Sequence, residues 1–215
     1  MIIFVTLLHL PFQMNNILEQ LLNGIQNLHW AEIIAVFFAI LYLVYAAKGK
    51  VICWAFGIIS CVFWAYAAFY LYDLYVDALL QLFYVVISFF GIYQWLYGGE
   101  KKKNLEVTSL TSKQHVLIIS VGFILTGIVG YFFDTYTSAA ATYLDSFTTT
   151  FSIITTFLVI QKKIDNWIYW FIINSVYVYL YWIREGYLFS FLFVVYLVIS
   201  VFGYFEWKKE FKKSQ

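Results

Sequence analysis

The stretch YVDALLQLFYVVISFFGIYQW, residues 75–95, recurs in altered form as YLFSFLFVVYLVISVFGYFEW, residues 187–207. Aligned at a distance of 112 residues, the two stretches share residues that include Tyr84, Ser88, Phe90, Gly91 and Trp95 of the first copy. Each stretch is predominantly apolar over about 20 residues, the length at which a helix crosses roughly 30 Å of hydrocarbon. The sequence therefore predicts a helical membrane protein with an internal duplication.

The duplication extends upstream with one residue of slippage, which aligns Trp54 with Trp167. Each half then has three helices. Because three is an odd number, a direct repeat needs one additional span to restore the chain direction, and residues 115–133 supply it. We expect a parallel 3+1+3 arrangement. It is shared with sugar carriers of the SWEET type, in which the substrate binds between the halves.

The composition supports an all-α integral membrane protein. Of the 215 residues, 63% are hydrophobic and 12% charged, whereas about a quarter of residues are charged in soluble domains. The length of the apolar runs, the single proline and the lack of alternating ten-residue segments favour helices over a membrane barrel. We expect a lipid bilayer around the chain and no nucleic-acid partner. Seven spans are predicted: 32–48, 51–71, 76–97, 115–133, 147–161, 166–183 and 187–207.

The basic residues predict the orientation, because short loops rich in Lys and Arg stay in the cytoplasm. Twelve of the thirteen fall on one side of this topology, and only Arg184 falls on the other. The amino terminus is thus expected outside and the carboxyl terminus inside, as in a bacterial inner-membrane protein. The predicted units are an interfacial segment 1–31, a first repeat 32–97, a cytoplasmic loop and connector helix 98–133, a second repeat 134–207 and a basic tail 208–215. No signal peptide is expected before Phe12, and either Met1 or Met14 is the start.

Polar residues within the spans mark candidate sites, because their burial in a bilayer is costly. Asp77, Gln81 and Tyr84 lie on one helical face of the third span, but the second copy has Phe in place of Asp77 and Gln81. Likewise, Trp170 aligns with Gly57 and Asn174 with Cys61. Residues present in only one half are typical of an off-centre binding site. The alternative is an interhelical hydrogen bond, which contributes below about 2 kcal/mol.

The sixth span predicts what this site binds. Trp167 and Trp170 lie one turn apart and Asn174 one turn further, so flat rings can stack and an amide can fix a ligand. A cationic ring gains further attraction to aromatic faces. No Lys or Arg is expected deep in a span, so an unphosphorylated ligand is favoured. Tyr177 is a further candidate, whereas Trp95 and Trp207 are interpreted as interfacial anchors.

These residues resemble the PnuC vitamin transporters over about residues 30–210. The resemblance lies in WAFG from Trp54, LYDLYVDALLQLFY leading to GIYQW, TYLDSFTTT, DNWIYWFIIN with its WxxW pair, and the final FGYFEWKK. It implies uptake of nicotinamide riboside by facilitated diffusion, followed by trapping through a cytoplasmic kinase. It also implies a substrate site between the halves, formed by Gln81, Tyr84, Trp167, Trp170, Asn174 and Tyr177.

Several alternatives remain open at this stage. Thiamine is also a flat cation without phosphate, and related subfamilies carry thiamine or riboflavin. A substrate-binding subunit of an ATP-driven vitamin importer is a further alternative. An enzyme is not expected, because His9, His29 and His115 are isolated near segment ends and no nucleophile and base share a face. No cofactor or metal is called for. Homo-oligomers are common in such bundles, but nothing in the sequence fixes a number.

Overall fold

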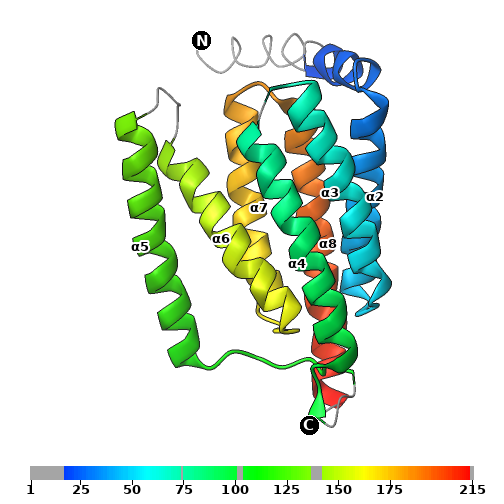
Figure 1. Ribbon diagram of the computed structural model, residues 1–215, viewed down its shortest axis with the longest axis vertical. Helices are drawn as coiled ribbons and strands as arrows, with labels where there is room; N and C mark the ends of the chain where they lie inside the picture. Colours follow the sequence, from blue (N-terminus) through cyan, green and yellow to red (C-terminus); the bar gives the residue numbers. More distant parts are fainter. Residues whose placement is uncertain (1–16, 74, 101–103, 137–141, 214–215) are drawn as a thin grey trace, which may run out of the picture.

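The structure, a computed structural model, describes residues 17–73, 75–100, 104–136 and 142–213. The choice between Met1 and Met14 lies outside these residues. A helix over residues 17–26 lies across one end of the bundle (Figure 1). The long helices are α2 (Trp30–Ala47), α3 (Ile52–Tyr70), α4 (Tyr75–Tyr97), α5 (Ser112–Tyr136), α6 (Thr142–Ile160), α7 (Asn166–Ile183) and α8 (Tyr187–Lys213).

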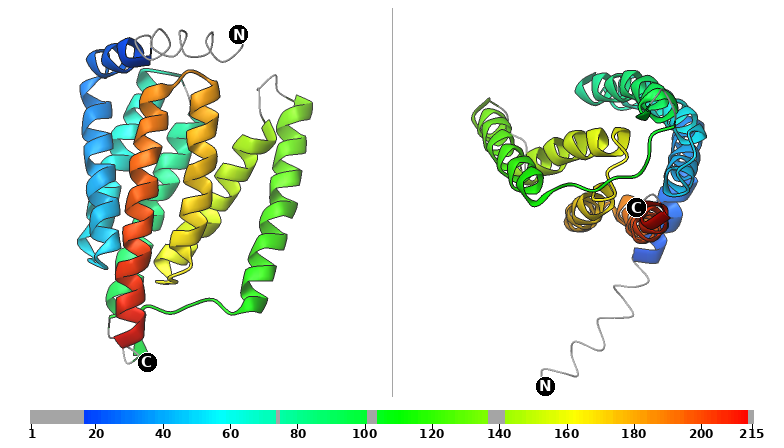
Figure 2. Two further views of the ribbon diagram at one scale, coloured as in Figure 1. Left: turned by 180° about the vertical axis from the view of Figure 1, so that it is seen from behind. Right: turned by 90° about the horizontal axis from the view of Figure 1, so that it is seen from below.

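The helices form two groups that meet along two seams. Within the groups, α3 packs on α2 and α4, and α7 packs on α6 and α8. Between the groups, α2 packs on α8 and α4 packs on α6. Helix α5 packs on α6 at the periphery, as the view along the bundle in Figure 2 shows. Two groups joined along two seams leave an interior that several helices can line.

Helix α5 contacts the bundle through close packing of its glycines and through side-chain hydrogen bonds at its start. Gly122 and Gly130 of α5 face the rings of Phe151 and Tyr143 so closely that a Cβ atom at either glycine would lie within 3.0 Å of ring atoms. At its start, His115 bonds the Asp165 carboxylate at 3.2 Å and the hydroxyl of Tyr169 at 2.9 Å. Small residues allow such close helix approach, and these contacts hold α5 against α6 and the start of α7.

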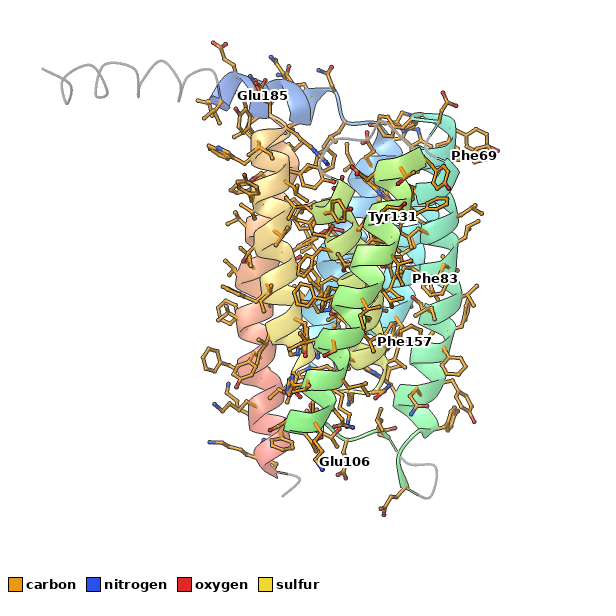
Figure 3. All side chains as sticks on the ribbon, turned by 90° about the vertical axis from the view of Figure 1, so that its left-hand side faces the viewer. Phe69, Phe83, Glu106, Tyr131, Phe157 and Glu185 are labelled. Carbon is orange, nitrogen blue, oxygen red and sulfur yellow. The ribbon has the colours of Figure 1, made fainter. Side chains whose placement is uncertain are left out.

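Six helices of the described chain are long and apolar enough to cross a membrane: α2, α3, α4, α5, α6 and α8. Large apolar side chains lie on their outer surfaces, and Leu79, Val86 and Tyr131 are about two-thirds exposed. Figure 3 labels Tyr131 among them. Helix α7 has the length of a span, but seven of its eighteen residues are Tyr or Trp and two are Asn. Its place as a seventh span stays a prediction.

Three helices have boundaries that differ from the predicted spans by three residues or more. Helix α6 begins at Thr142 instead of residue 147, because Thr, Ser and Asp residues dilute the apolar signal of its first two turns. Helix α5 is longer at both ends than predicted, and α8 continues to Lys213. The extension of α8 is polar and therefore invisible to a search for apolar runs, although its Lys residues favour the C-terminal end of a helix.

The two ends of the bundle differ in charge. The basic end, at the bottom of Figure 1, has the α2–α3 and α6–α7 turns, the start of α5 and the end of α8, with Lys48, Lys50, Lys113, Lys162, Lys163, Lys208, Lys209, Lys212 and Lys213. The acidic end has the α3–α4 and α7–α8 turns, with Glu32, Asp73, Asp77, Asp145, Arg184 and Glu185. Figure 3 labels Glu185 there.

Local packing recurs at positions that the internal alignment pairs. The indole of Trp54 lies against Gly91, and that of Trp167 lies against Gly203. The turns also match in backbone conformation: Gly49 and Lys162 have φ of 64° and 49°, and Asp73 and Glu185 have φ of 54° and 59°. A close indole–glycine contact and two left-handed turns therefore occur in each group of three helices.

Candidate functional site

A cavity of about 890 Å³ lies at the acidic end, between the two groups of helices. At its mouth, Asp73, Asp77 and Arg184 are exposed, and toward the bundle interior it reaches Gln81, Ser60 and Tyr196. Its remaining lining residues are Ala35, Val36, Ala39, Trp64, Leu80, Phe133, Asp145, Thr148, Thr149, Tyr177, Tyr181, Phe189, Leu192 and Phe193. The volume falls within the range of pockets that hold small molecules.

One part of the cavity wall is built from stacked aromatic rings of α7 and α8. Phe193 is nearly parallel to Tyr177 and Tyr181, with ring centroids 4.5 and 5.4 Å apart. Phe189 lies 5.3 Å from Tyr181 and 6.2 Å from Trp64 of α3. Such offset arrangements are favourable for aromatic pairs and give the wall flat faces.

Another part of the wall is polar and comes from α4 and α6. Asp77 and Gln81 lie four residues apart on α4 and so share a face of that helix. Thr148 and Thr149 of α6 add hydroxyl groups. A ligand in the cavity therefore has access to flat rings, an amide, hydroxyls and a carboxylate.

Two contacts made by acidic residues join helices at the acidic end, and one of them lies at the mouth of the cavity. Asp145 of α6 binds Arg184 with oxygen–nitrogen distances of 2.7 and 3.3 Å, and this hydrogen bond raises the pKa of Arg184. Tyr72 and Glu32 stand at the positions that the internal alignment pairs with Arg184 and Asp145, and the Tyr72 hydroxyl donates to Glu32 of α2 at 2.6 Å. Burial and, to a lesser extent, the hydrogen bond to Glu32 raise the pKa of Tyr72 to about 12, so the phenol keeps its proton at neutral pH. Each contact joins the first helix of a group to the turn after the second.

The basic end is closed by four buried tryptophans, Trp54, Trp95, Trp167 and Trp207, here called the tryptophan cluster. Trp95 and Trp207 lie at its centre, 5.8 Å apart between ring centroids. Trp54 makes an edge-on contact with Trp95, and Trp167 makes one with Trp207, each at 5.5 Å. All four are at most 2% exposed. The prediction that Trp95 and Trp207 are interfacial anchors is therefore wrong, because both indoles are enclosed by other rings.

The tryptophan cluster also links the two helix groups by hydrogen bonds. The Trp95 indole N–H donates to the carbonyl of Val159 on α6 at 3.0 Å, and the Trp207 N–H donates to Ala46 on α2 at 2.9 Å. Each third helix is thereby bound to the end of the first helix of the other group. Beside them, the Lys162 ammonium lies 4.9 Å from the Trp95 ring and 3.5 Å from Glu210.

The residues predicted to bind substrate occupy three different places. Gln81 and Tyr177 line the cavity. Asn174 is buried, with its amide donating to the Ser200 hydroxyl at 3.4 Å, and Tyr84 is half-buried further along α4 from Gln81. Trp167 belongs to the tryptophan cluster. Trp170 packs against the buried core around that cluster and against a second buried core of Phe151, Leu158, Tyr169 and Ile173. The assignment of these six residues to one site stays a prediction.

Sequence reasoning missed several lining residues. Asp145 lies in a Thr-rich segment whose alignment with Glu32 would have drawn attention to it, and Arg184 seemed to be only a loop cation. In the sequence, Phe189 and Phe193 are recognisable only as the apolar counterparts of Asp77 and Gln81. Their pairing with Tyr177 and Tyr181 depends on how α7 packs on α8, which the sequence of either helix alone does not give.

Comparisons with known proteins place this arrangement in context. The sequence profile of the nicotinamide mononucleotide transporter family matches residues 29–209, from the start of α2 into the last turns of α8. A nicotinamide riboside transporter PnuC of Neisseria mucosa is 30% identical over 196 residues, covering 86% of this chain and 74% of that protein. The crystal structure of the vitamin B3 transporter PnuC superposes with a TM-score of 0.70 at 26% identity, over 95% of this chain and 93% of the other.

Proposed function

This chain belongs to the nicotinamide mononucleotide transporter family, and we propose that it carries nicotinamide riboside across a membrane by facilitated diffusion. Its relatives are named as transporters, so it is grouped with carriers and not with enzymes. The observation that carries the proposal is the cavity, in which stacked Tyr and Phe rings lie beside an amide and carboxylates. A flat, positively charged nicotinamide ring and a hydroxylated ribose match these two kinds of surface.

The charge of the lining favours the riboside over the mononucleotide. Asp73, Asp77 and Asp145 line the cavity, and Arg184 is the cation among the described lining residues. Because Arg184 is bound to Asp145, a phosphate would have to compete with a carboxylate for it and would meet two more carboxylates nearby. Thiamine, also an unphosphorylated cation, remains the second candidate substrate on the same grounds.

The proposed arrangement in the membrane has seven spans, including α7, in a parallel 3+1+3 repeat. It is supported by the matched indole–glycine contacts and left-handed turns of the two groups. With the lysines of the basic end in the cytoplasm, the amino terminus is outside and the cavity faces outward. We place the protein in a bacterial inner membrane. The proposed interfacial segment is 1–31, of which residues 1–16 lie outside the described part of the chain, and the proposed loop and connector and tail are 98–133 and 208–215.

The proposed cycle alternates between the two ends. The cavity is accessible at the acidic end while the tryptophan cluster closes the basic end, so substrate delivery to the cytoplasm requires the cluster to separate. The further site residues, Tyr84, Trp167, Trp170 and Asn174, lie between cavity and cluster or within the cluster and would meet substrate as it moves inward. Phosphorylation by a cytoplasmic kinase would trap the substrate, and a homo-oligomer is compatible with the apolar outer surface.

The test is calorimetric titration of the detergent-purified protein with nicotinamide riboside, thiamine, riboflavin and nicotinamide mononucleotide. We expect the riboside to bind most tightly. In liposomes, uptake should stop at equal concentrations and ignore an imposed proton gradient. Accumulation above equilibrium without metabolism would exclude facilitated diffusion, and copurification of an ATPase would favour an ATP-driven importer.

A further inference from the structure

The two copies of the internal repeat differ where they line the cavity. On α4 the cavity is lined by Asp77 and Gln81, whereas the paired positions on α8 are Phe189 and Phe193. Further along the same helices, the paired positions are identical glycines and tryptophans. The cavity therefore combines an acidic, polar stripe from one copy with an aromatic stripe from the other.

The aromatic stripe is already ordered for a flat ligand. Phe193 lies within 20° of parallel to Tyr177 and within 15° of parallel to Tyr181. The faces of such rings carry partial negative charge and attract cations, most strongly where water is limited. This surface accepts a heteroaromatic ring whether it is charged or not, so a preference for charge has to come from another group.

Asp77 is placed to supply that preference. Its side chain is exposed and lines the same cavity as Tyr177, Tyr181 and Phe193. Asp145 also lines the cavity, but its carboxylate is bound to the Arg184 guanidinium at 2.7 Å. The charge of Asp145 is therefore largely balanced by Arg184, which leaves Asp77 as the acidic residue that α4 contributes to the cavity lining.

We propose that Asp77 is a specificity-determining residue that selects ligands with a permanently positive aromatic ring. This inference rests on the proposed function and adds the reason for choosing a cation over an uncharged ring of the same size. At an intermediate effective dielectric constant, a charge pair several ångströms apart corresponds to about a tenfold change in affinity. The gain should fall as salt is added, because the mouth is open to solvent.

The experiment compares nicotinamide riboside with its freshly prepared 1,4-dihydro form, which has nearly the same size but an uncharged ring. Both are titrated into the wild-type protein and the Asp77→Asn variant. The wild type should bind the charged form about tenfold more tightly. The variant should lose most of that ratio through weaker binding of the charged form alone. Unchanged binding of the dihydro form also shows that the variant is folded.

The matched control is Glu185→Gln, which removes one carboxylate from the same end of the bundle but not from the cavity lining. It should keep the wild-type ratio. Equal weakening of both ligands in Asp77→Asn would overturn the inference, because it would assign Asp77 a structural or hydrogen-bonding role. A wild type that binds both forms equally would also overturn it and leave the proposed function standing. A wild type that binds neither would overturn the proposed function itself.

Discussion

The basic and acidic ends of the bundle use the internal repeat in opposite ways. At the basic end the paired positions are the same: two indoles lie against two glycines, and two central indoles donate to the ends of the opposite first helices. At the acidic end the paired positions have diverged, with Asp77 and Gln81 against two phenylalanines and an ion pair against a Tyr–Glu bond. Symmetry is retained where the halves bind each other and lost around the cavity that we propose as the ligand site.

This difference has a physical origin. Two equivalent surfaces that close on each other can satisfy the same contacts twice, so identical residues suffice. A small ligand such as a nucleoside has no matching two-fold symmetry, so the surfaces around it must present different groups. The following predictions test whether the basic end is the mechanical part of the molecule and the acidic end the recognition part.

The largest loss of stability is expected for Trp207→Ala. The indole is fully buried, contacts Trp95 and Trp167 and donates a hydrogen bond across the two groups. Removing a buried indole destabilises a protein by about 3–5 kcal/mol. The free energy of unfolding can be measured by titration with a denaturing detergent. Trp182→Ala is the control, because that side chain is 52% exposed on the bundle surface; equal effects would mean that the tryptophan cluster does not hold the halves together.

A smaller loss is expected when the indole–glycine contacts are crowded. A Cβ atom at Gly91 or Gly203 would lie closer than 3.0 Å to the Trp54 or Trp167 ring. Overpacking of this kind costs about 1–3 kcal/mol, so Gly91→Ala and Gly203→Ala should each unfold more readily. A Cβ atom at Gly127 would have nothing within 4 Å, so Gly127→Ala should be neutral or up to about 1 kcal/mol more stable. A strong effect at only one of the two paired glycines would show that the repeat is not symmetric in energy.

The sequence predicts the duplication better than it predicts the surroundings of the repeated tryptophans. Apolar runs and the recurrence of Gly91 and Trp95 as Gly203 and Trp207 predict the helices and the duplication. The same pattern does not distinguish an indole at a lipid interface from one that packs between two others, since both positions end an apolar helix. The sequence therefore predicts an interfacial position for Trp95 and Trp207, whereas the structure buries both.

The candidate site is only partly readable from the sequence for a related reason. Gln81 and Tyr177 lie on polar stripes of single helices, and the stripe alone places them at the cavity. The Asp145–Arg184 pair joins residues 39 positions apart, so it depends on the packing of α6 against α7. Phe189 and Phe193 carry no polar signal, and their role emerges only from the rings beside them.

Hydrogen bonding at the basic end can be separated from ring burial by two matched substitutions. Trp95 and Trp54 are both at most 1% exposed, but only Trp95 donates from its indole N–H within the part of the chain that the structure describes. Trp95→Phe should therefore be less stable than Trp54→Phe by about 1–2 kcal/mol, since the Val159 carbonyl loses its partner. Equal unfolding free energies in the two variants would assign the stability of the cluster to ring packing alone.

The smallest change in stability is expected at the mouth, for Arg184→Gln. Both side chains of the Asp145–Arg184 ion pair are 42% exposed, and exposed pairs contribute about 0–1 kcal/mol. Recognition is the more informative readout, because the substitution removes the cation and frees the Asp145 carboxylate. Binding of nicotinamide riboside should be unchanged or tighter, and binding of the mononucleotide should become weaker still. If the riboside instead binds more weakly, Arg184 contacts the ligand directly, and the acidic end then recognises its substrate with both charges instead of with its carboxylates alone.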